Sequence, residues 1–302
     1  MSAGRRPRLV RTGALLLVLL LVGAATLRFL PGSPWHSDAA AGIVGGDGGQ
    51  AGTPGPGPEP TPTSTLRPLP FQATGVDLDL DGWYAWSVLD RRTGELTGSP
   101  NMAETSTTAS MIKAWVVADQ LRRTDRAGER PSDSELHDLS LIIRESNNEL
   151  THELWDTLGG TDSITRLIRT CELTDSSASD DTFWSRTRLS ARDTARLGGC
   201  IADGTAAGPR WTKWLLEEMR QVHGLGDFGI REAFPAAQRA GIAIKNGWVE
   251  RTERDGEDEI HVNCLAVADE WTMGVMLRYP KDLGYEYGMA GCEKITAALL
   301  AD

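Results

Sequence analysis

The chain has 302 residues, 40% of them hydrophobic, and a formal net charge of −11, so it is long enough for one large domain with additional segments. Residues 1–30 hold five of the 31 basic residues and no acidic one, which leaves 26 basic and 42 acidic residues in the remainder; such an acidic body argues against a nucleic-acid partner. The four cysteines and five histidines show no zinc-type spacing, and we expect neither a metal site nor a cofactor.

The N-terminus resembles an export signal. Residues 1–12 carry four arginines, and Ala14–Leu27 is apolar and rich in leucine. We therefore predict a signal anchor or signal peptide over residues 1–30. We favour an uncleaved anchor, a single membrane helix with the body on the extracytoplasmic side; a cleaved peptide, and hence a secreted protein, is the alternative.

A spacer is predicted next. Residues 31–75 are rich in Gly, Pro and Thr, with few apolar residues to bury, so we predict a disordered linker. It would separate the membrane from a body that spans residues 76–302.

The body begins with a predicted hairpin and a buried helix. Trp83–Asp90 reads as a strand and Glu95–Thr97 as the start of its return strand, and Ser99–Thr107 is polar and predicted to be loop. Thr107 or Thr108 is expected to cap the helix that follows, because an apolar run begins at Ala114.

Helices and then strands fill the rest of the chain. We expect surface turns at Arg122–Pro131 and Arg251–Asp258, and capping boxes at Ser132–Glu135 and Ser190–Asp193, the second opening a helix through Cys200 and Ile201. Further helices are expected over Glu135–Glu145, Glu149–Leu158, Ser163–Arg169, Arg210–Met219 and Tyr287–Leu300, and strands over Gly241–Glu250, Ile260–Ala268 and Thr272–Tyr279.

The predicted start of the buried helix carries a possible nucleophile. Ser110 would lie in the first turn, where free N–H groups and the positive end of the dipole gather. Lys113 follows three residues later on the same face. A buried lysine with a lowered pKa can accept the serine proton, whereas an arginine cannot.

Two later motifs support this interpretation. Ser146-Asn147-Asn148 follows a predicted helix, and Lys245-Asn246-Gly247 lies in a predicted strand. The order S-x-x-K, S-x-N, K-x-G resembles that of the penicillin-binding proteins and class A β-lactamases. The resemblance extends from about Val76 to the C-terminus. It implies an α+β fold in which N- and C-terminal segments form one antiparallel sheet and a helical domain is inserted between them.

The resemblance implies a role for each motif residue. Ser110 would be acylated, Lys113 would act as its base, and Ser146 would relay a proton to the leaving group. Asn148 would hold the substrate amide or orient Lys113. Lys245 would place positive charge near Ser146 and a substrate carboxylate, and Gly247 would keep the strand open to substrate. The N–H groups of Ser110 and Trp248 would form the oxyanion hole.

Several departures from the family pattern bear on catalysis. Asn147 replaces the common Asp, and Asn246 replaces a Thr or Ser whose hydroxyl helps to bind the substrate carboxylate. The Trp248 side chain either narrows the cleft or faces the core. Between Glu172 and Arg188 no E-x-x-x-N sequence occurs, and Asp180 and Asp181 are one carbon shorter than glutamate. The residues thus favour a stable acyl-enzyme or slow hydrolysis over fast β-lactam turnover.

Simpler interpretations of two motif residues compete with these roles. Ser146 could be the exposed N-cap of the Glu149 helix, and Lys245 could be a surface lysine on an edge strand.

Three functions follow as hypotheses. The first is an exported serine acyl-hydrolase that acts as a monomer on a peptidoglycan-type peptide, an ester or a β-lactam. The second is a catalytically silent relative that binds wall peptides or a partner protein. The third is a class A-like β-lactamase.

The cysteines suggest disulfides, because an exported chain meets oxidising conditions. Four cysteines allow three pairings. We favour Cys171–Cys200 and Cys264–Cys292, with buried free thiols as the alternative.

Overall fold

A five-stranded antiparallel sheet forms the base of the fold in a computed structural model, which describes residues 66–72, 76, 78–179, 183–252, 256 and 258–300. The strand order is β2-β1-β7-β6-β5. The strands are β1 (Trp83–Asp90), β2 (Leu96–Gly98), β5 (Ala243–Thr252), β6 (Asp258–Val267) and β7 (Trp271–Pro280), and a separate pair is formed by β3 (Thr105–Thr107) and β4 (Arg188–Ser190).

The sheet joins the two ends of the body. β1 pairs with β7 along its whole length, from Trp83 opposite Arg278 to Asp90 opposite Trp271. The predicted sheet of N- and C-terminal segments is therefore confirmed. β5 is an edge strand, so it has a partner on one side only, and its free edge is available to a ligand.

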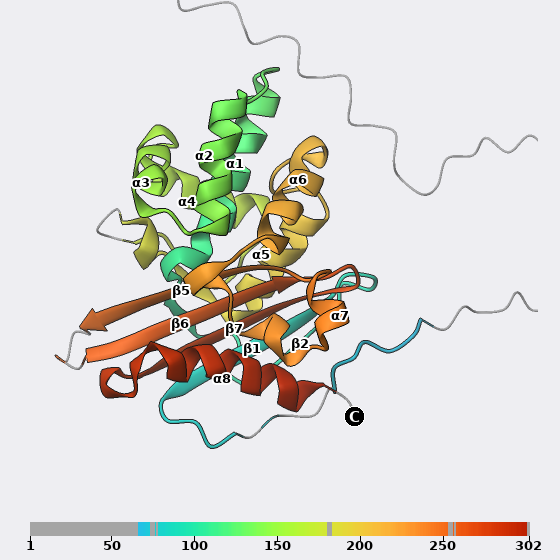
Figure 1. The fold of residues 1–302 in the computed structure, drawn as a ribbon, viewed down its shortest axis with the longest axis vertical. Helices are drawn as coiled ribbons and strands as arrows, with labels where there is room; N and C mark the ends of the chain where they lie inside the picture. The colour runs from blue at the N-terminus through green and yellow to red at the C-terminus, as the bar shows by residue number, and fades with distance from the viewer. Residues whose placement is uncertain are drawn as a thin grey trace, which may run out of the picture. The chain divides into compact units, whose positions relative to one another are not determined.

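Helices cover both faces of this sheet (Figure 1). The helical domain lies on one face, with α5 packed on β1 and β7, and α8 lies on the other face against β6 and β7. The helices are α1 (Lys113–Arg126), α2 (Asp133–Arg144), α3 (Asn148–Thr157), α4 (Thr161–Thr170), α5 (Ala191–Ala202), α6 (Pro209–Arg220), α7 (Ala236–Arg239) and α8 (Gly284–Leu299), with 3-10 turns η1 (Ala109–Ile112), η2 (Trp184–Arg186), η3 (Gly224–Gly226), η4 (Ile230–Ala233) and η5 (Lys281–Leu283).

The buried helix α1 is the centre of the helical domain. It contacts α2, α3, α4, α5 and α6, and its residues from Lys113 to Ala118 are fully buried. It runs to Arg126, past the turn predicted to begin at Arg122. Arg122 is held inside because it pairs with the buried Asp119, which also accepts hydrogen bonds from Arg166 and Ser163 of α4.

Local signals gave two helix starts correctly. Ser132 and Glu135 form the predicted reciprocal capping box of α2. Ser190 caps α5 through the Asp193 N–H, but the Asp193 carboxylate does not complete a box; it accepts bonds from the N–H groups of Thr174 and Asp175. Asp193 thereby fixes the loop after α4. The strand β3 was predicted to be loop, because its partner β4 lies more than 80 residues away.

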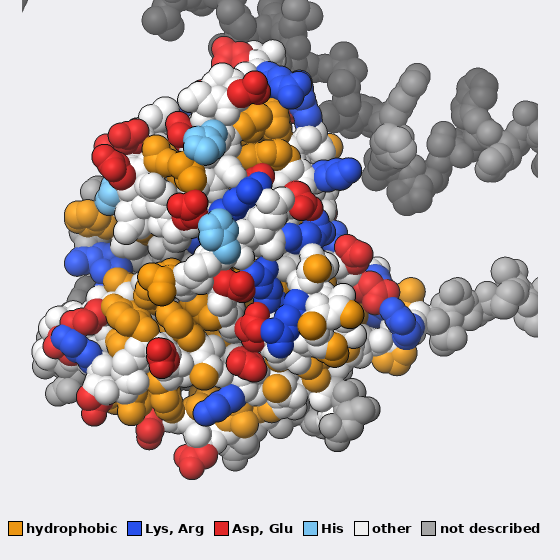
Figure 2. All heavy atoms as spheres, viewed as in Figure 1, with side chains coloured by type: hydrophobic (Ala, Val, Ile, Leu, Met, Phe, Trp, Pro, Cys, Tyr) orange, Lys and Arg blue, Asp and Glu red, His pale blue; other side chains and the backbone are white. Residues whose placement is uncertain are grey.

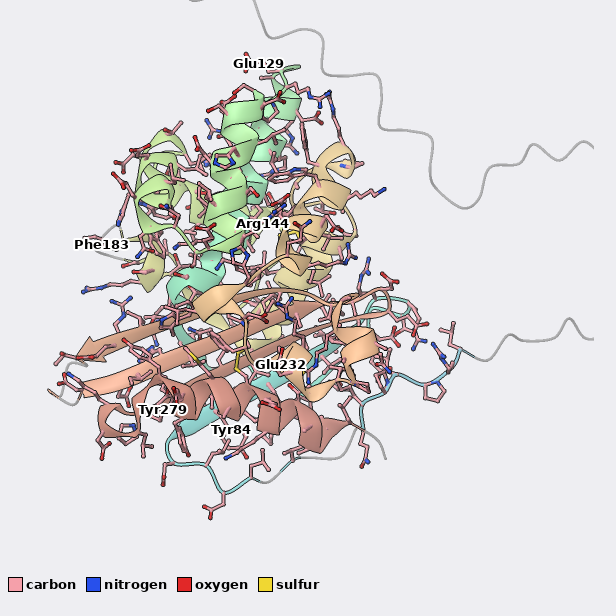
Figure 3. The ribbon with its side chains drawn as sticks, in the orientation of Figure 1. Tyr84, Glu129, Arg144, Phe183, Glu232 and Tyr279 are labelled. Atoms are coloured by element: carbon pink, nitrogen blue, oxygen red, sulfur yellow. A yellow bond between two sulfur atoms is a disulfide. The ribbon has the colours of Figure 1, made fainter. Side chains whose placement is uncertain are left out.

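Both predicted disulfides are present, and their sulfur bonds are visible in Figure 3. Cys171–Cys200 joins the end of α4 to α5, and Cys264–Cys292 joins β6 to α8. Cysteine bridges of this kind indicate an oxidising, extracytoplasmic compartment.

The predicted signal anchor (1–30) and most of the linker (31–75) lie outside the described residues. Within the described part of the chain, no helix has the length and apolarity needed to cross a membrane. Residues 66–72, predicted as linker, contact the body: Gln72 N–H donates to Leu299 O at 2.7 Å, and the Phe71 ring packs edge-on against Trp271.

The surface of the viewed face is mixed (Figure 2). Acidic and basic side chains are interspersed over the helical domain, and apolar side chains gather below it, over the sheet and α8. Neither positive nor negative side chains predominate on this face.

Candidate active site

Ser110 lies in the 3-10 turn η1, which leads directly into α1. The predicted side-chain cap is wrong for both threonines. Thr108 makes no capping bond, and its N–H donates to Thr187 O at 2.9 Å. The Thr107 hydroxyl instead lies 2.7 Å from His261 Nδ1. The turn is held by its neighbours in the fold, and Ala109 adopts a left-handed φ of 47° immediately before the serine.

Gly247 places β5 against this turn. A Cβ atom at Gly247 would lie 2.4 Å from Met111 N and 2.7 Å from Ser110 N. Only a residue without a side chain lets the two backbones approach so closely. The glycine thus sets the position of Ser110 relative to the edge strand, which is a different contribution from keeping the strand open to a substrate.

Lys113 is fully buried at the start of α1. Its Nζ lies 2.6 Å from Ser146 O, 2.7 Å from Asn148 Oδ1 and 3.2 Å from Ser146 Oγ. Burial, with a smaller contribution from the charge of Lys245, lowers the pKa of Lys113 to about 6. At neutral pH the side chain is mainly an uncharged amine, which can accept a proton.

Ser146 joins the two motif lysines. It has a left-handed φ of 61° between α2 and α3, and Lys245 Nζ lies 3.1 Å from its hydroxyl oxygen. Lys245 is fully buried, so the surface-lysine alternative is wrong, and burial lowers its pKa to about 7. A neutral Lys113 has two N–H groups for the two shorter contacts and a lone pair for the Ser146 hydroxyl. Lys245 can then donate to the same hydroxyl.

The two asparagines after Ser146 have different roles. Asn147 is the N-cap of α3, because its Oδ1 accepts the Leu150 N–H at 3.0 Å, so the N-cap alternative for Ser146 is wrong. A carboxylate is not needed for this cap, which accounts for Asn in place of Asp. Asn148 Oδ1 contacts Lys113 and so orients its nitrogen.

Asn246 points away from the serine. Its Nδ2 donates to Gly226 O at 3.0 Å and to Phe228 O at 2.7 Å, and the side chain is buried. Trp248, two residues on, packs edge-on against the Phe228 ring at 5.6 Å. Alternation along the strand puts both side chains on the face opposite Lys245. Asn246 therefore anchors the loop at 226–228, and the Trp248 ring rests on that loop.

A cavity of about 350 Å³ opens beside Ser110. Its lining residues are Ala109, Ser110, Asn148, His152, Phe183, Trp184, Ser185, Arg186, Trp248, Val249 and Arg251. Phe183 stands at the margin of the molecule beside the end of β5 (Figure 3). A larger cavity, of about 620 Å³, lies near Phe234 and Trp271, and none of the described residues that line it is a serine, cysteine or histidine.

The comparisons with known proteins agree with this geometry. A model of the β-lactamase enzyme family matches residues 124–257, a range that includes Ser146, Asn148, Lys245 and Gly247. A class A β-lactamase from Mycobacterium abscessus is similar in structure, with a TM-score of 0.56, 16% identity, and coverage of 73% of this chain and 93% of that one. The match over residues 124–257 and the shared fold support a relationship to the serine β-lactamases.

Other β-lactamases of known structure show the same fold at similarly low identity. A β-lactamase from Burkholderia vietnamiensis has a TM-score of 0.57 and 17% identity over 72% of this chain and 89% of that one. One from Xanthomonas campestris has a TM-score of 0.56 and 17% identity over 72% and 91%. No curated protein matches the sequence. The predicted fold is thus confirmed, and the family match supports a serine hydrolase.

The β-lactamase-like site differs from the class A pattern beside Lys113. Trp184 lies there, with its ring centroid 4.7 Å from Lys113 Nζ and only 5% of its surface exposed. Within the described residues, no Asp or Glu lines the cavity. Glu172 lines a different cavity, of about 590 Å³, beside Cys171 and Cys200. Asp180 and Asp181 lie outside the described residues.

Sequence reasoning missed two residues of the site, Trp184 and His152. His152 follows Asn148 by four residues in α3, and this spacing puts both on one face of the helix. The four-residue spacing from Asn148 could therefore have placed His152 on the side of the helix that faces the site. Trp184 had no such signal, because the segment that carries it has no regular pattern.

Proposed function

We propose that this protein is an exported serine acyl-hydrolase that forms an acyl ester on Ser110 and hydrolyses it slowly. The observation that supports the proposal most directly is the shared hydroxyl of Ser146, which lies within 3.2 Å of Lys113 Nζ and 3.1 Å of Lys245 Nζ. Neither lysine has an ion-pair partner among the described residues, and burying a lysine without one is costly. A structural role does not require it, but proton transfer does.

Acylation would begin with Lys113. Within the described residues the Ser110 hydroxyl makes no hydrogen bond, and Lys113 Nζ contacts Ser146 and Asn148. On substrate binding, the neutral amine exchanges its contact with the Ser146 hydroxyl for one with Ser110 and takes the proton. The Ser110 oxygen attacks the substrate carbonyl, and the N–H groups of Ser110 and Trp248 hold the negative oxygen.

The leaving group would receive its proton from Ser146. Lys245, the more basic of the two lysines, donates to the Ser146 oxygen and stabilises the charge that develops when this hydroxyl gives up its proton. The same ammonium group attracts a carboxylate on the substrate. Asn246 takes no part in that contact, because its amide is bound to the loop carbonyls.

Hydrolysis of the ester would be slow. Class A enzymes use a glutamate to activate the water. Here an apolar indole, Trp184, lies beside Lys113, and no carboxylate of the described residues lines the cavity. An ester on Ser110 would therefore persist after the leaving group departs.

The natural donor would be a peptidoglycan-type peptide or a related amide or ester, with a β-lactam as its mimic. A monomer attached to the membrane through residues 1–30 would reach the wall across the predicted linker. The disulfides support a location outside the cytoplasm.

A fluorescent penicillin tests the proposal. The full chain is expected to acquire a lasting covalent label, seen on a denaturing gel and as the added mass of one penicillin. Ser110→Ala is expected to remove the label. The absence of an adduct with penicillins, cephalosporins and activated esters would refute the proposal and favour a silent binding domain. Rapid loss of the antibiotic without a lasting adduct would favour a β-lactamase.

A further inference from the structure

His152 lines the cavity that contains Ser110. It lies in α3, one helical turn after Asn148, whose side chain contacts Lys113. The other ionisable side chains of the described residues that line this cavity are Arg186 and Arg251. Arginine stays protonated, whereas a neutral imidazole has a nitrogen lone pair that can accept a proton from water.

Aromatic contacts fix the direction of the His152 ring. The ring lies 5.7 Å from the Trp184 ring and 6.4 Å from the Phe183 ring, with edge-to-face geometry in both cases. The Lys113 nitrogen lies against the same indole, 4.7 Å from its ring centroid. The imidazole is thus an exposed group that packs on two aromatic rings in the lining of the cavity.

The charged groups around His152 have both signs. On α3, Glu149 lies three residues before it and Asp156 four residues after it, so both neighbour it on the helix. Arg186 and Arg251 line the same cavity, and Lys113 Nζ lies 4.7 Å from the centroid of the Trp184 ring. The His152 ring therefore has both acidic and basic side chains among its neighbours.

We propose that His152 is the base that activates water for hydrolysis of the acyl-serine. This inference rests on the proposed function, because it concerns the fate of the ester on Ser110. The imidazole takes a proton from water while the water oxygen bonds to the ester carbonyl carbon. In this addition the electron pair of the carbonyl bond moves onto its oxygen, which becomes an oxyanion. The carbonyl bond then re-forms, and the bond between the carbon and Ser110 Oγ breaks. The Ser110 oxygen then takes back the proton from the imidazolium, and the acid is released.

The lifetime of the adduct tests this assignment. The full chain is labelled with fluorescent penicillin, unlabelled penicillin is added in excess, and loss of label is followed at pH 7. His152→Gln is expected to slow release by about 100-fold while the rate of labelling stays unchanged. Imidazole added to His152→Ala is expected to restore part of the rate.

A matched substitution controls for indirect effects. His137→Gln changes an exposed histidine of α2 outside the cavity and is expected to leave release unchanged. If His152→Gln forms the adduct and releases it within threefold of the natural chain, the role of His152 is refuted while the proposed function stands. If neither chain forms an adduct, the proposed function fails and the inference fails with it.

Discussion

Replacing Lys113 by arginine is the sharpest test of the acylation chemistry. A lysine with the ordinary pKa of 10.5 is neutral in about one molecule in 3,000 at pH 7, whereas a pKa of about 6 makes about nine in ten neutral. The fold thus raises the fraction of usable base by about 3,000-fold. Arginine keeps the positive charge but cannot give up its proton, so Lys113→Arg is expected to lower the acylation rate by about 10²- to 10⁴-fold.

The assay is the second-order rate of labelling by fluorescent penicillin from pH 5 to 9. In the natural chain, the rate is expected to rise as pH passes about 6, where Lys113 loses its proton, and to fall above about 7, where Lys245 does. Lys213→Arg, at an exposed lysine of α6, is the control and should match the natural chain. The reasoning is refuted if Lys113→Arg labels within threefold of the natural chain, or if the rate keeps rising to pH 9.

Three further changes test the structural account. Lys113→Met is expected to raise the free energy of unfolding at pH 7. Because the folded-state pKa of Lys113 lies below the unfolded value, the natural chain gains stability as pH rises from about 6 towards 10.5. In denaturant titrations, the difference in unfolding free energy between Lys113→Met and the natural chain should therefore become smaller over that pH range. Asn246→Ala is expected to cost about 2 kcal/mol in urea unfolding, because two loop carbonyls lose their donor; an unchanged midpoint would contradict the anchor role. Gly247→Ala would place a methyl group 2.4 Å from Met111 N, so labelling of Ser110 should fall at least tenfold while circular dichroism remains native, and full labelling would count against the contact between β5 and η1.

The sequence alone determined features whose cause lies within a few residues. The capping box at Ser132 and Glu135 and the three strands β5, β6 and β7 depend on near neighbours in the sequence, and they were predicted correctly. Both cysteine pairings were favoured from the expected elements and are present. The order of the three motifs indicated the superfamily, because the motif residues are recognisable before their positions in space are known.

Only the tertiary structure decided what the motif residues contact. Lys245 and Ser146 are 99 positions apart, and whether the lysine is buried depends on how β5 packs against η1. The same packing turns Asn246 towards the loop at 226–228. Trp184 comes next to Lys113 through an irregular segment without a periodic pattern. Local pattern fixes which residues share a face, but the lowered lysine pKa values arise from desolvation, which only the assembled core provides.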